Sequence, residues 1–143
     1  MRALIAIIIG LVVGLAVTIA IGIAGGLLYP PSGTASLTDP EQVIEVFARS
    51  PLGLRIALML GWFGGALAGA ACAKLIARKA WAAWAVTGLI AAYVVINIFA
   101  LPMPGWMQAL SFVAPLLGGL IGNHLVGGAA ADAAAHDAAA ADG

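Results

Sequence analysis

One stretch of the chain decides its fold: ALIAIIIGLVVGLAVTIAIGIAGGLL, residues 3–28. It contains no charged residue, whereas a helix needs about 20 apolar residues to cross the hydrocarbon core of a bilayer. A secretion signal has an apolar core of only about 7 to 15 residues, so we expect this segment to stay in the membrane as a helix. Three further apolar stretches follow, at residues 54–73, 80–101 and 106–126.

The composition of the whole chain is also that of a membrane protein. Of the 143 residues, 64% are hydrophobic and 8% are charged, against about 45–50% and about 25% in soluble domains. Six Lys and Arg residues balance six Asp and Glu residues, so no net charge attracts nucleic acid. We predict an all-α integral membrane four-helix bundle over residues 1–126, followed by an alanine-rich, disordered cytoplasmic tail over residues 127–143.

The longest connection between the apolar stretches contains a short helix of its own, at about residues 39–49. Asp39 suits the N-cap, Pro40 suits the first helical position, and Gln42 completes a capping-box spacing. Charged and apolar side chains of this segment fall on opposite sides of a helix. We expect an amphipathic helix that lies on the outer membrane surface or covers the end of the bundle.

Basic residues predict the orientation, because Lys and Arg in short loops are retained on the cytoplasmic side of a membrane. Four of the six fall on one side of the predicted bundle, namely Arg2, Lys74, Arg78 and Lys79. The other two fall on the opposite side. Both termini are therefore predicted to be cytoplasmic.

Small residues recur every four positions in two of the predicted helices, and small residues allow the close backbone approach on which helix contacts in lipid depend. They are Gly10, Gly14, Thr18, Gly22 and Gly26 in residues 3–28, and Gly61, Gly65 and Gly69 in residues 54–73. We expect these two helices to meet along the small residues. Besides lipid, the expected partners are a second copy of the chain or another membrane protein.

The predicted spans offer little chemistry. Arg55 and Lys74 lie at helix ends, and the single Cys and two His residues have no metal-ligand spacing. We therefore predict no enzymatic activity, no cofactor and no metal. Two weak sets of candidates remain. A polar cluster or pore lining would use Thr87, Asn97, Gln108 and Ser111. A flat apolar ligand such as a quinone would contact Trp62 and Tyr93.

Several short motifs carry a resemblance to a known group. They are Tyr29-Pro30-Pro31, Pro51-Leu52-Gly53, Gly61-Trp62 with Gly65 and Gly69, and Pro102, Pro104 and Trp106. Over about residues 5–125 the chain resembles a group of small four-helix bacterial inner-membrane proteins of uncharacterised function. The resemblance implies the four-helix topology and a bacterial inner membrane, and it implies no site residues.

Three functions are compatible with these features. The leading hypothesis is a non-enzymatic accessory or assembly protein that packs through its glycine-rich helix faces, as a subunit of a larger membrane complex. The alternative is a passive oligomeric pore or small transporter for ions or small neutral solutes. The third is a binder of an apolar cofactor or quinone.

Overall fold

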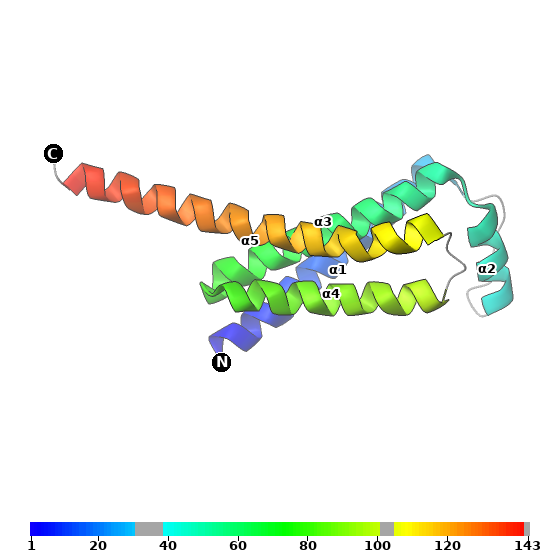
Figure 1. Ribbon diagram of the computed structural model, residues 1–143, viewed down its shortest axis with the longest axis horizontal. Coiled ribbons are helices and arrows are strands. Elements are labelled where there is room, and N and C mark those ends of the chain that lie inside the picture. Colours follow the sequence, from blue (N-terminus) through cyan, green and yellow to red (C-terminus); the bar gives the residue numbers. More distant parts are fainter. Residues whose placement is uncertain (31–38, 101–104, 142–143) are drawn as a thin grey trace.

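The computed structural model describes residues 1–30, 39–100 and 105–141, which form five helices (Figure 1). The helices are α1 (Arg2–Leu28), α2 (Pro40–Arg49), α3 (Leu52–Ala77), α4 (Ala80–Ala100) and α5 (Gly105–Ala141). Four of them, α1, α3, α4 and α5, are long and apolar enough to span a membrane. The structure confirms the predicted all-α four-helix bundle with a short helix between its first two spanning helices.

The bundle has two ends that differ in what they carry. Both chain termini lie at one end and α2 lies at the other (Figure 1). We call these the terminal end and the α2 end. The sequence between α4 and α5 contains Pro102 and Pro104, and residues 101–104 lie outside the described residues.

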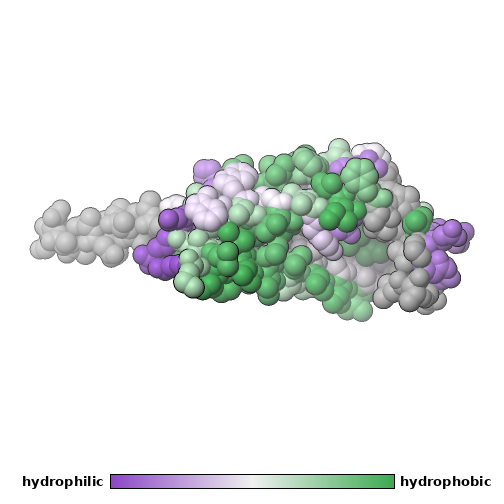
Figure 2. Space-filling model, turned by 90° about the horizontal axis from the view of Figure 1, so that it is seen from below, coloured by the Kyte–Doolittle hydropathy of each residue, from purple (hydrophilic) through white to green (hydrophobic). Residues whose placement is uncertain are grey.

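Large apolar side chains cover the outside of the bundle, and small ones fill much of its interior. Figure 2 shows hydrophobic residues over most of the long side that it displays, with hydrophilic residues toward the two ends. The completely buried alanines are Ala6, Ala66, Ala70, Ala73, Ala82 and Ala83. In lipid a large apolar side chain needs no burial, whereas close helix contacts need small residues. This distribution of side chains fits a bundle whose outer surface contacts lipid.

α3 is the central helix of the bundle. It contacts α1, α4 and α5, and α4 in turn contacts α1 and α5. α3 ends where Arg78 adopts the left-handed conformation with φ 54° and donates its amide to the Lys74 carbonyl at 2.7 Å, a common helix C-cap. The helix is longer at both ends than the predicted span of 54–73, because neither Leu52 nor Lys74 interrupts a helix.

α1 and α3 approach so closely that their backbones touch. A Cβ atom added to Gly10 would lie 2.7 Å from the carbonyl oxygen of Gly69. One added to Gly14 would lie 2.8 Å from the carbonyl oxygen of Gly65. Ordinary van der Waals contacts of a Cβ begin at about 3.4 Å, so no larger residue fits at Gly10 or Gly14 without moving a helix.

Thr18 continues the same contact and adds a polar interaction to it. Its Oγ1 donates to the carbonyl oxygen of Gly61 on α3 at 3.1 Å and to that of Gly14 on α1 at 2.9 Å. The hydroxyl also lies where a Cβ of Gly65 would be. A side chain at position 65 would therefore remove the space that this hydroxyl needs.

Beyond Thr18, the residues of α1 that face α3 no longer recur at every fourth position. A Cβ on Gly22 would reach only Leu58, at 3.9 Å, and one on Gly26 would meet nothing within 4 Å. Gly25 faces Ala57 of α3 instead. Eight residues from Thr18 turn an α-helix by about 80° from its starting face, whereas seven bring it back to within about 20°. The contact thus passes from Thr18 to Gly25, and the prediction for Gly26 is wrong.

Asp39 caps α2, as its sequence predicts, and Gln42 bonds to the carboxylate of Asp39. An Asp39 carboxylate oxygen accepts the amide of Glu41 at 3.1 Å, and the other oxygen accepts Gln42 Nε2 at 2.8 Å. The last turn of α2 is joined to α3, because Arg55 Nη2 donates to the carbonyl oxygen of Ala48 at 2.7 Å. The short helix is therefore attached to the α2 end of the central helix.

The structure differs from the sequence prediction after residue 126. α5 continues to Ala141, where a disordered tail was expected from residue 127. Alanine has the highest helix propensity of all residues, so an alanine-rich segment that follows a formed helix extends its hydrogen-bonded ladder. This part of α5 projects beyond the other helices at the terminal end (Figure 1).

The contact between α1 and α3 gives a first prediction. Gly14→Leu should lower the thermal stability of the bundle in detergent, because the new side chain meets the Gly65 carbonyl and Ile90. Overpacking of this kind costs about 1–3 kcal/mol. The matched control is Gly26→Leu on the same helix, where a Cβ has open space. Circular dichroism melts would contradict the prediction if both variants melted at the same temperature.

Candidate functional site

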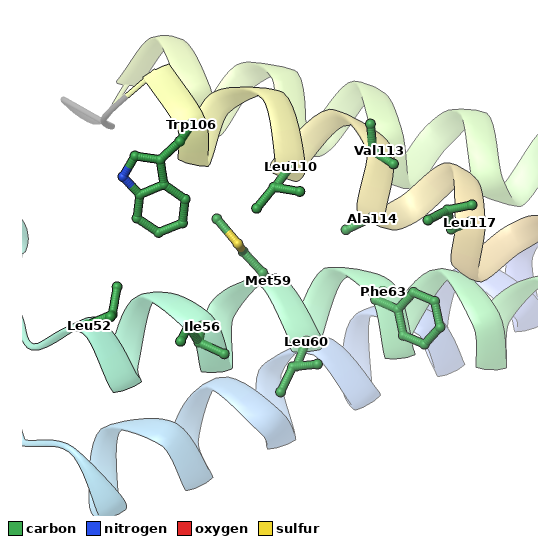
Figure 3. A pocket seen from close by; sticks show the side chains of 10 residues that line it. All are labelled: Leu52, Ile56, Met59, Leu60, Phe63, Trp106, Leu110, Val113, Ala114 and Leu117. Carbon is green, nitrogen blue, oxygen red and sulfur yellow. The ribbon is translucent and has the colours of Figure 1, made fainter.

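An apolar groove lies between α3 and α5 at the α2 end (Figure 3). Its volume is about 760 Å³. The α3 side consists of Leu52, Ile56, Met59, Leu60 and Phe63, and the α5 side of Trp106, Leu110, Val113, Ala114 and Leu117. We call these ten residues the α3–α5 groove.

The groove exists because α3 and α5 are close at one level and separate at another. Near its inner limit, Gly118 lies against the Phe63 carbonyl, and Gly122 lies against the Leu67 carbonyl. Toward the α2 end the facing side chains are large, and the two helices run apart (Figure 3). Small residues thus set one end of the groove, and large ones keep its other end open.

The groove surface is almost entirely hydrocarbon. Met59 extends from α3 toward α5, and Trp106 and Leu110 extend from α5 toward α3 (Figure 3). The indole nitrogen of Trp106 is the one side-chain N or O atom among the ten lining residues, and it lies at the α2 end. These side chains supply no acid, base or nucleophile, so the groove is suited to bind apolar matter and not to perform acid–base chemistry.

The two residues proposed for an apolar cofactor differ in burial. Trp62 is 4% exposed and packs with Met59, Val94 and Met107 inside the bundle. Tyr93 is 45% exposed, so its ring faces outward. Trp62 fills the interior beside the groove, and Met59 is the residue that belongs to both.

The four polar candidates are distributed along the bundle. Thr87 is buried against Gly119 and donates to the Ala83 carbonyl at 2.9 Å. Asn97 donates to the Tyr93 carbonyl at 2.8 Å. Both bonds return to the carbonyl four residues earlier on α4. Ten residues of helix, or about 15 Å, separate Thr87 from Asn97.

The other two polar candidates lie on α5 and differ in burial. Ser111 is completely buried, and its hydroxyl has no hydrogen-bond partner among the described residues. Gln108 is exposed. Ser111 lies four residues before Pro115, whose missing amide leaves the Ser111 carbonyl without its usual helical donor.

Charged side chains connect the helices near the ends of the spans. Lys74 Nζ donates a short hydrogen bond to the carbonyl oxygen of Asn123, which joins α3 to α5. Arg2 Nε donates to the carbonyl oxygen of Ile76 at 3.0 Å, which joins α1 to α3. Within the described residues no three His, Cys, Asp or Glu side chains are grouped to hold a metal ion.

The sequence reasoning missed the groove, although a signal for it exists. The lining residues have the same spacing on both helices, at positions 0, 4, 7, 8 and 11 counted from Leu52 and from Trp106. This spacing keeps each set on one helix face. Large apolar residues on one face are equally typical of a surface in contact with lipid, so the spacing alone does not distinguish a groove.

Comparison of the chain with known protein families, with curated proteins and with solved structures finds no match. The function of the chain is therefore inferred from its sequence and its geometry.

The bond between Lys74 and Asn123 gives a second prediction. Lys74→Met should destabilise the bundle, because hydrogen bonds to charged groups contribute about 1.5–3 kcal/mol and this one joins α3 to α5 near the terminal end. Lys79→Met is the matched control, since Lys79 is exposed. Unfolding by titration with a denaturing detergent measures both. Equal midpoints for the two variants would contradict a stabilising role of this bond.

Proposed function

We propose that this chain is a non-enzymatic accessory or assembly protein of a membrane, and that it receives another membrane component in the α3–α5 groove. The volume and lining of the groove are the main support for this proposal. Its volume of about 760 Å³ lies within the range of about 300–1,000 Å³ that is typical of ligand sites. Its apolar lining suits a component that is itself dissolved in the bilayer.

The packing of the other helices supports this role. α3 is held by α1 along a backbone contact and by α4 on a further side. We propose that this close packing through small residues keeps the α3 wall of the groove in place within the membrane. The component received would be lipid, a second copy of the chain or another membrane protein.

We further propose a bacterial inner membrane as the location, with both termini in the cytoplasm. The resemblance to bacterial four-helix proteins supports the compartment. The distribution of basic residues supports the orientation, since the terminal end carries Arg2, Lys74, Arg78 and Lys79. In this orientation the groove lies in the outer leaflet.

The third prediction tests whether the groove is where the component binds. Ala114→Trp should fill the groove, because Ala114 is one of its lining residues. Ala109→Trp makes the same chemical change at an exposed position of α5 outside the lining. The full chain is tagged, extracted in mild detergent from its own membrane, and its associated proteins and lipids are identified by native mass spectrometry.

We expect a stoichiometric component with the unchanged chain and with Ala109→Trp, and its loss with Ala114→Trp. The same components with all three proteins would contradict the proposal. Flux of ions or small neutral solutes through liposomes that contain the purified chain would favour the pore instead.

A further inference from the structure

We infer that the α3–α5 groove binds one hydrocarbon tail of a membrane lipid, taken from the leaflet at the α2 end. The inference rests on the proposed function and names the component that the groove receives. Length, lining and the position of the closed end support it.

The length of the groove matches one leaflet. Its two walls run from Leu52 to Phe63 and from Trp106 to Leu117, eleven residue steps each, or about 16 Å of helix. The hydrocarbon core of a bilayer is about 30 Å thick, so one leaflet accounts for about 15 Å of it. Leu52 is the first residue of α3. The groove thus begins at one end of a membrane span and reaches about the middle of the bilayer.

The two ends of the groove differ as the ends of a lipid tail do. At the α2 end lies Trp106, whose ring is of the kind that is enriched where hydrocarbon meets the lipid headgroups. At the inner end Gly118 meets the Phe63 carbonyl, and this contact limits the space between the helices. A tail that enters beside Trp106 would end near Phe63 and Leu117 without crossing into the other leaflet.

The lining favours a flexible chain over a second helix. Helix contacts in lipid use small residues, and this molecule does so between α1 and α3, where a Cβ on Gly10 would lie 2.7 Å from the facing carbonyl. In the groove, Ala114 is the one small residue among ten. A helix with its side chains is about 10–12 Å across and would touch the large groove side chains at their tips. A hydrocarbon tail bends to follow them.

The test uses the full chain in vesicles of phosphatidylethanolamine and phosphatidylglycerol that contain a little phosphatidylglycerol with a diazirine in the middle of one tail. Irradiation attaches this tail to the side chains beside it, and mass spectrometry locates the label. We expect label on Met59, Phe63 and Ala114 to exceed by several-fold the label on Ile8 and Ile19, two exposed side chains of α1. Equal labelling of the groove and of α1 would overturn the inference.

The two tryptophan variants test whether the label depends on an open groove. Ala114→Trp should reduce the label on Met59 and Phe63 to the level of α1, and Ala109→Trp should leave it unchanged. If Ala114→Trp does not fold, the map of the unchanged chain still decides the question.

A groove without label has two different meanings, which the purification experiment separates. If the component lost with Ala114→Trp is a second copy of the chain or another protein, the groove binds a helix. The inference then fails and the proposed function stands. If Ala114→Trp loses no component, both the inference and the proposed function fail.

Discussion

The close approach of α1 and α3 is the contact on which the rest of the structure depends. In a bilayer an apolar side chain gains little by moving from lipid into protein, so helices associate through van der Waals contact and a few polar bonds. Gly10 and Gly14 let the α1 backbone reach α3, and Thr18 adds a hydrogen bond to Gly61 at 3.1 Å. With α3 fixed in this way, its other faces are presented to α4 and α5.

The same rule explains both where α3 and α5 touch and where they do not. Gly118 and Gly122 bring the α5 backbone against α3, whereas Met59 and Leu110, which extend toward each other from α3 and α5 (Figure 3), line the open part of the groove. Residue size along two helix faces is therefore enough to produce a closed half and an open half. The groove needs no irregular loop to form it.

The sequence was sufficient for the features that depend on local chemistry. Hydropathy located the four spans, and Asp39 with Gln42 located α2. The sequence was insufficient for features that depend on how two helices are placed relative to each other. The contact of α3 with Gly25 rather than Gly26 depends on which face of α1 the neighbouring helix follows. Thr87 could be identified as polar, but not as a hydroxyl already bonded to its own helix at 2.9 Å. The groove could not be predicted, because it depends on which faces of α3 and α5 meet. The sequence of each helix alone does not show this.

The contact at Gly118 and Gly122 has a mechanical consequence. It lies at the inner limit of the groove, so any rotation of α3 against α5 would be centred near it. Such a rotation would displace the helices more with increasing distance from the contact, and it would change the opening most at the α2 end. Because Arg55 attaches α2 to α3 through the Ala48 carbonyl, α2 would move with α3 in such a rotation. A change in the position of α2 would therefore change the width of the groove at the α2 end.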